Sequence, residues 1–174
     1  MASIPDQIVL KTHRDLEGLA WTVWIRRGVI ALLTALIILA LLNVFGQRPS
    51  SVRADATQAS LQVYAPSHLR GGLLYMARFT ISAHQEVKKA MLVLDSGWAE
   101  SAQINTIEPS PVDEASDKGR LSFDLGHIPA GDKYRLFMEF QINPNNVGNR
   151  DQDVELLDGK THILTIHRSV FVYP

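Results

Sequence analysis

The chain has 174 residues, a formal net charge of −1 and no cysteine. The lack of cysteine excludes disulfides, lipoprotein acylation and thiolate metal sites, and the balanced charge excludes the concentrated positive surface that nucleic-acid binding requires. The length allows one globular domain beside a membrane helix.

Residues 1–27 form a short tail that carries four basic and three acidic side chains. We predict a cytoplasmic tail that ends in an interfacial segment. Trp21 and Trp24 lie just before Arg26 and Arg27, at the depth where indole rings favour the membrane–water interface. These four side chains are therefore the expected membrane anchor.

Residues 28–45 contain no charged side chain, and eighteen helical residues span about 27 Å, close to the hydrocarbon thickness of a bilayer. The sequence thus predicts a single transmembrane helix with the lipid bilayer as a partner. More Lys and Arg flank its N-terminal side than its C-terminal side, which indicates a plasma-membrane protein with a cytoplasmic N-terminus and an extracytoplasmic C-terminal domain. A cleaved signal peptide is the alternative, with a small-x-small site at 54–56, but the apolar run is long for a signal and favours an uncleaved signal anchor.

Residues 46–58 are polar and are predicted to be a linker. From residue 59 to residue 174 the apolar side chains alternate, and turn residues follow every 8–15 positions. Half-polar strands at this spacing are typical of an antiparallel immunoglobulin-like β-sandwich. We predict strands around residues 61–63, 73–81, 90–94, 102–106, 121–125, 134–142, 154–156 and 162–173. In the clearest of them, Phe140 is expected in the core on one face with Tyr134, Leu136, Met138 and Ile142.

Two long loops, 109–119 and 143–153, are rich in side-chain oxygen. The second has enough oxygen atoms for calcium, but Asn, Pro and Gly also favour ordinary turns, and both interpretations remain open. If successive strands simply reverse, the two loops share the end of the sandwich that faces the membrane. Trp98 is either an exposed binding aromatic or a core residue. The hypothetical interaction residues are Pro109, Pro111, Asp113, Asn143, Asn145, Asn146 and Trp98.

Motifs for catalysis are missing from the sequence: it has no G-x-S-x-G, H-E-x-x-H or P-loop pattern. We therefore expect no enzyme activity and no cofactor, and we assign no metal-binding residues.

Residues 94–98 and the unit 119–132, which leads into the strand 134–142, form a recognisable pattern: a strand that ends in Asp-Ser-Gly-Trp, then G-x-L-x-F-x-L-G and Ile-Pro-Ala-Gly-Asp. This pattern resembles the immunoglobulin-like conserved-repeat domains of bacterial cell-surface proteins. In layout the chain also resembles small single-pass membrane proteins of actinobacteria without an assigned activity. These resemblances imply a non-catalytic extracytoplasmic module.

The function expected from the sequence is that of a membrane-anchored, non-catalytic binding module outside the cytoplasm, an accessory subunit that contacts a membrane-protein partner. The alternative is a module that binds an envelope polymer or carbohydrate.

Overall fold

The computed structural model describes residues 20–44, 46–100, 102–145 and 147–174, and the chain divides into two compact units, Met1–Val44 and Phe45–Pro174. The first unit contains helix α1, Ala20–Leu41. The segment Trp21–Leu41 is apolar and long enough to span a membrane, and none of it is buried.

The described part of α1 starts at Ala20, the first described residue, and includes Trp21, Trp24 and the two arginines of the predicted membrane anchor. It ends at Leu41 in a turn where Asn43 adopts a φ of 53°. The guanidinium of Arg27 lies 5.5 Å from the centre of the Trp24 ring. The tail predicted for residues 1–27 lies outside the described residues up to residue 19.

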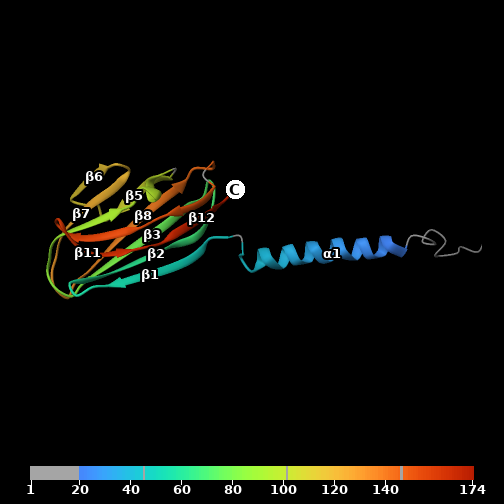
Figure 1. Ribbon diagram of the computed structural model, residues 1–174, viewed down its shortest axis with the longest axis horizontal. Coiled ribbons are helices and arrows are strands. Elements are labelled where there is room, and N and C mark those ends of the chain that lie inside the picture. The colour runs from blue at the N-terminus through green and yellow to red at the C-terminus, as the bar shows by residue number, and fades with distance from the viewer. Residues whose placement is uncertain (1–19, 45, 101, 146) are drawn as a thin grey trace, which may run out of the picture. The chain divides into compact units, whose positions relative to one another are not determined.

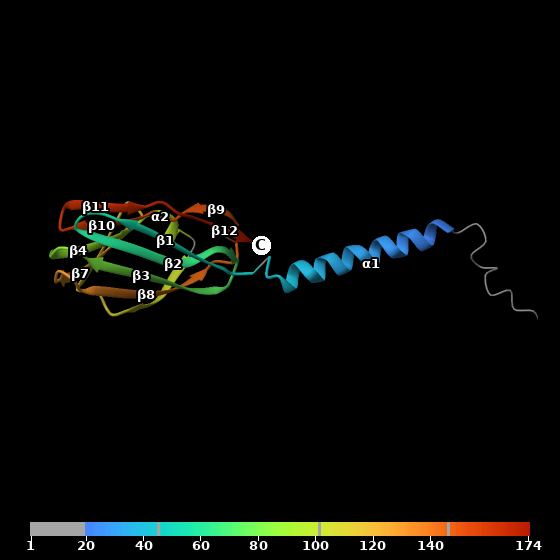
Figure 2. The same ribbon diagram turned by 90° about the horizontal axis from the view of Figure 1, so that it is seen from below.

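The second unit is a β-sandwich of two sheets (Figures 1 and 2). The larger sheet has the strand order β5-β8-β3-β2-β12-β9, with β1 also paired to β2; the smaller sheet has the order β11-β10-β4-β7-β6. All pairings are antiparallel except that of β12 with β2. The elements are β1 Arg48–Asp55, β2 Ala59–Arg70, β3 Leu74–Ala83, β4 Val87–Leu94, α2 Ser96–Ala99, β5 Ala102–Glu108, β6 Asp113–Asp117, β7 Arg120–Ile128, β8 Lys133–Ile142, β9 Gly148–Asp151, β10 Val154–Asp158, β11 Thr161–Ile166 and β12 Ser169–Tyr173.

The sandwich predicted from the sequence is confirmed, but three strands lie where the sequence indicated a linker or loops. Strand β1 occupies most of the expected linker 46–58, β6 lies in the expected loop 109–119, and β9 lies in the expected loop 143–153. Each is an outer strand of its sheet, so its ladder partner stabilises it more than its own burial does. The last predicted strand, 162–173, is divided into β11 and β12.

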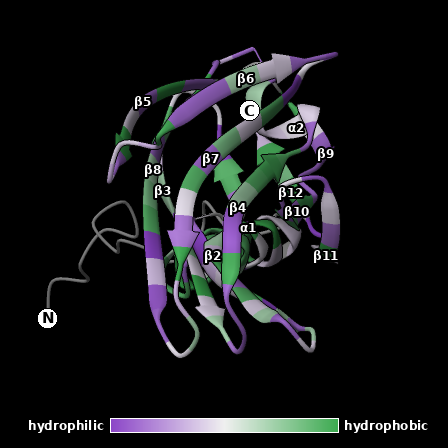
Figure 3. Cartoon of the chain, turned by 90° about the vertical axis from the view of Figure 1, so that its left-hand side faces the viewer, coloured by the Kyte–Doolittle hydropathy of each residue, from purple (hydrophilic) through white to green (hydrophobic). Residues whose placement is uncertain are grey.

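Alternate residues of the facing strands form the core, and Figure 3 colours these strands by the hydropathy of each residue. Phe140 is fully buried, with Leu136, Met138 and Ile142 on the same face of β8 and Tyr134 half-buried beside them, so this part of the prediction is confirmed. The Phe140 ring lies between Tyr75 and Trp98, at centroid distances of 5.2 and 5.4 Å.

The sandwich has two ends, which we name by where its chain begins. The proximal end holds Arg48, the turn 71–73 and the loop residues 143–145 and 147. It is joined by bonds from Gly71 N–H to Tyr173 O and from Gly72 N–H to Ile142 O. The distal end holds the turns 56–58, 84–86, 129–132 and 158–160, and Gln58 connects three of them through Glu86 O and Asp158 Oδ2.

The expectation that loops 109–119 and 143–151 share one end is therefore wrong. Strand β5 starts opposite Ile142 at the proximal end and runs away from it, so residues 109–112 lie toward the distal end, while residues 143–145 and 147 lie at the proximal end. The prediction assumed that each strand reverses the direction of the one before it. The additional strand β1 adds one reversal before residues 109–112 and so moves them to the other end, and β6 adds a second reversal, which returns residues 143–145 and 147 to the predicted end.

Candidate functional site

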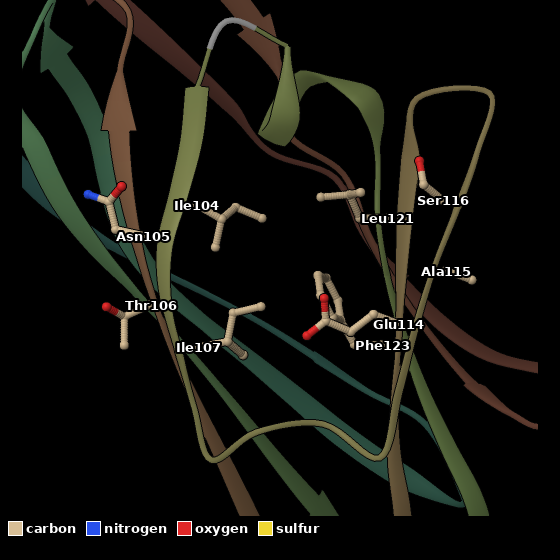
Figure 4. Close-up of a pocket in the computed structure, with 9 residues that line it drawn as sticks. All are labelled: Ile104, Asn105, Thr106, Ile107, Glu114, Ala115, Ser116, Leu121 and Phe123. Carbon is tan, nitrogen blue, oxygen red and sulfur yellow. The ribbon is translucent and has the colours of Figure 1, made fainter.

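A groove opens along one side of the sandwich, between the outer strand β5 of the larger sheet and the outer strand β6 of the smaller one (Figure 4). It has a volume of about 430 Å³, within the range of ligand sites in proteins. The connection 109–112 joins the two strands and closes one end of the groove (Figure 4). The lining residues are Ile104, Asn105, Thr106, Ile107, Glu114, Ala115, Ser116, Leu121 and Phe123.

The apolar wall of the groove depends on an irregularity in β5. The register between β5 and β8 shifts between Ile104 and Thr106, so that Asn105 is an extra residue. Such a bulge reverses which side chains point inward. As a result Ile104 and Ile107, three positions apart, both point toward Leu121 and Phe123, where regular alternation would place them on opposite faces (Figure 4).

The opposite wall is acidic. All five residues of β6 are exposed, and Glu114 lies opposite Phe123 in the ladder with β7, which places its carboxylate beside the apolar side chains (Figure 4). The segment 108–117 contains Glu108, Asp113, Glu114 and Asp117 and no basic residue. The groove therefore combines an apolar floor with a negative rim.

Both flanking strands have an unused edge. Among the strands of the described residues, β5 pairs with β8 alone and β6 with β7 alone. A strand with a free row of N–H and C=O groups can accept another strand, and an inward-pointing charge is one way in which proteins limit such pairing to suitable partners. The groove can thus hold an extended chain by backbone bonds along β5.

The predicted interaction residues are divided among three places. Pro109, Pro111 and Asp113 lie in or next to the connection that closes the groove, and the Glu108–Pro109 peptide is cis. Asn143 and Asn145 lie at the proximal end, where Asn145 N–H donates to Asn143 Oδ1 at 3.3 Å. Asn146 lies outside the described residues.

The structure corrects the set of hypothetical interaction residues at Trp98, which is fully buried and not exposed for binding. It lies on α2, where Gly97 permits a close approach: a Cβ there would lie 1.7 Å from Asp151 O. The Trp98 Nε1–H donates to Asp153 O at 3.1 Å, so the core alternative is what the structure shows.

The sequence analysis missed Ile104, Ile107, Leu121 and Phe123 as a site. The available signal was the three-residue spacing of Ile104 and Ile107 inside a strand, which only a bulge reconciles with a common face. Among the described residues, no three His, Asp or Glu side chains are grouped so as to hold a metal.

No family model matches the chain, and no curated protein matches it. Solved structures resemble it in fold. CaCohA2 from Clostridium acetobutylicum is 14% identical, with 68% of this chain and 92% of that chain covered and a TM-score of 0.47. The chitin-binding domain of a Pyrococcus furiosus chitinase is 12% identical, with coverages of 67% and 100% and a TM-score of 0.41. A CARDB domain from the same organism is 10% identical, with coverages of 71% and 95% and a TM-score of 0.40. At these values the similarities carry no argument about what this chain binds.

Proposed function

We propose that the protein is a non-catalytic binding module, anchored in the plasma membrane by α1 with its β-sandwich outside the cytoplasm, that holds an extended segment of a membrane-protein partner in the β5–β6 groove. The observation that carries the proposal is the groove itself, an apolar floor between two sheet edges that no other strand of the described residues pairs with. Backbone bonds to β5 supply affinity in this mode, and alternate side chains supply specificity.

The chemistry of the groove indicates the chemistry of the segment. Every second side chain of a strand added to β5 enters the groove, where Ile104, Ile107 and Phe123 favour apolar groups. The carboxylates of Glu114 and its neighbours favour Lys or Arg at the rim. The expected occupant is therefore an extended segment with apolar and basic side chains.

Defined peptides test the proposal with the full-length protein in lipid nanodiscs. Fluorescent eight-residue peptides alternate Val with Lys, or Val with Glu, and a third peptide has the Val/Lys composition in a non-alternating order. We expect saturable binding of the alternating Val/Lys peptide by fluorescence anisotropy, and at least tenfold weaker binding of the other two. Equal binding of the Val/Lys and Val/Glu peptides would contradict the proposal.

Variants locate the binding. Ile107→Lys puts a charge on the floor and Glu114→Lys reverses the rim charge, so each is expected to weaken Val/Lys binding at least tenfold. The matched control is Asp132→Lys, the same kind of charge reversal in a distal turn at a residue that does not line the groove. If Asp132→Lys weakens binding as much as Glu114→Lys, the peptide responds to net charge and not to the groove.

A second candidate, binding of an envelope polymer or carbohydrate, is favoured by a row on the outer face of the larger sheet. Tyr64 and Phe137 are both exposed and lie directly opposite Arg78 on either side, and Arg78 stacks on Tyr64 at 5.0 Å. The two rings are thus about 10 Å apart, a spacing suited to a flat, repeating ligand. Co-sedimentation with isolated cell wall tests it: loss in Tyr64→Ala/Phe137→Ala but not in Ile107→Lys supports the polymer.

A further inference from the structure

The proximal end of the sandwich carries exposed apolar side chains on two loops that touch. Leu73 and Leu74 are 43% and 50% exposed, and Val147 is 46% exposed. The loops are close because Gly72 N–H donates to Ile142 O, and a Cβ on Gly71 would lie 2.8 Å from Pro144 O. Large apolar side chains at loop tips are unusual unless something covers them.

This apolar tip is bonded to the start of the domain. The Gln47 side chain donates from Nε2 to Leu74 O at 2.9 Å. Only residues 42–47 separate Leu41, the last residue of α1, from Arg48, the first of β1. Even a fully extended chain of this length reaches no more than about 25 Å. If α1 spans the membrane, the tip can never be far from the headgroups.

The surroundings of the tip are basic. Arg48 and Arg70 are both exposed and flank Leu73 and Leu74, one at the start of β1 and the other immediately before the turn. Apolar side chains beside cations are the composition of surfaces that insert into the headgroup region of anionic membranes.

The distal end differs in character. Its turns at 56–58, 84–86, 129–132 and 158–160 contain no exposed large hydrophobic residue, and they carry charges of both signs, Glu86, Asp132 and Asp158 together with Lys160. Val112, in the connection beside the groove, is the exception at that end. The proximal end, with its exposed apolar side chains and neighbouring arginines, is therefore the end that is suited to contact lipid.

We propose that Leu73, Leu74 and Val147 insert into the headgroup region of the bilayer, with Arg48 and Arg70 next to lipid phosphates. The proposal rests on the membrane anchoring proposed above, and it adds a second attachment that fixes the domain against the membrane surface. The groove would then open sideways, parallel to the bilayer, where a neighbouring membrane protein presents its extracytoplasmic segments.

The absence of cysteine makes single-site labelling direct. The full-length variants Leu73→Cys and Lys160→Cys place an environment-sensitive fluorophore at the proximal and distal ends. They are measured in nanodiscs of three parts phosphatidylcholine to one part phosphatidylglycerol, with and without headgroup-spin-labelled lipid. We expect quenching at residue 73 to exceed that at residue 160 at least threefold. Equal quenching, or stronger quenching at residue 160, would overturn the inference.

Two further measurements separate the possible failures. Carbonate extraction of membranes tests the anchor alone: if the protein is extracted, the anchoring and the inference both fail, and if it is retained without quenching at residue 73, only the inference fails. In a second experiment the fluorophore is attached at Asn145→Cys. Adding the triple substitution Leu73→Ser/Leu74→Ser/Val147→Ser to this labelled protein should remove at least half of its quenching. A shielded but unquenched label at residue 73 would show a protein surface there in place of lipid, against the inference.

Discussion

The guanidinium carbon of Arg168 lies 4.9 Å from the centre of the Trp98 ring, which it covers at the boundary between β11 and β12. Its Nη2 donates to Pro66 O at 2.8 Å, and its Nη1, like the nearby Gln152 Oε1, is buried without a partner among the described residues. Burial lowers the pKa of Arg168 to about 10. Arg168 lies between Ile166 and Ser169, where the last predicted strand divides into β11 of the smaller sheet and β12 of the larger one.

Arg168→Ala is therefore expected to lower the free energy of unfolding by about 2 kcal/mol. A desolvated cation–π contact contributes about this much, and the loss of the bond to Pro66 is partly offset by removal of a buried charge. The measurement is urea unfolding of the full chain in detergent, followed by Trp98 fluorescence in a Trp21→Phe/Trp24→Phe background. Arg135→Ala, on the outer face of β8, serves as the control and should change it by less than about 0.5 kcal/mol.

Phe140→Ala should cost about 3–5 kcal/mol by the same measurement, because the lost ring leaves a cavity between Tyr75 and Trp98. A domain of ordinary stability, about 5–15 kcal/mol, would be left marginal. A loss below about 1 kcal/mol would be incompatible with the packing described for β8.

Gly97→Ala should prevent α2 from packing as it does. The added Cβ would lie 1.7 Å from Asp151 O, and only a movement of the backbone could relieve this clash. We therefore expect the free energy of unfolding to fall by at least about 3 kcal/mol, or the protein to fail to fold. Ser96→Ala adds no atom at the neighbouring position and should be nearly neutral. If both variants unfold at the same urea concentration, α2 is not held against β9.

The sequence predicted the central strands because their burial is visible in their own residues. Strand β8, for example, alternates between buried and exposed positions along its whole length. The missed strands lack that signal: all of β6 is exposed, β9 has four polar or small residues, and in β1 only half-buried small groups such as Val52 and Ala54 alternate. Their pairing partners decide their structure, and no local pattern shows those partners.

The groove could not be predicted for a related reason. It exists because β5 and β6 are outer strands of different sheets on the same side of the sandwich, and because a bulge at Asn105 turns Ile107 inward. Strand order is a long-range property that no local pattern shows. The predicted interaction residues Pro109, Pro111 and Asp113 lie next to one end of the groove, and their role stays a prediction.

Stability at alkaline pH should depend on Tyr75. Burial raises its pKa to about 12, against smaller lowering effects of Gln152 and Arg168. Because the folded pKa is above the unfolded value of about 10, the contribution of Tyr75 is complete below pH 10 and is lost as pH rises toward 12. The lowered pKa of Arg168 makes stability rise with pH in the same range. Arg168 is unchanged in Tyr75→Phe, so this effect is present in both the unmodified protein and the variant.

Tyr75→Phe removes the phenol and with it this loss. We expect the stability of the unmodified protein relative to Tyr75→Phe to fall by about 1.4 kcal/mol between pH 8 and pH 11, measured by urea unfolding with circular dichroism. Parallel pH profiles for the two proteins would mean that the Tyr75 hydroxyl is not buried in solution.

The final prediction concerns the N-terminus, which we expect to stay uncleaved. Processing at the small-x-small site 54–56 would remove β1, since residues 48–55 pair along β2 from Ser60 to His68. The Val52 and Ala54 side chains that pack on the core would be lost, and the buried strand β2 would be left with an open edge prone to association. The intact mass of the protein purified from membranes decides the matter. A mass that corresponds to a start near residue 57 would mean that the mature domain folds without β1 and has no anchor.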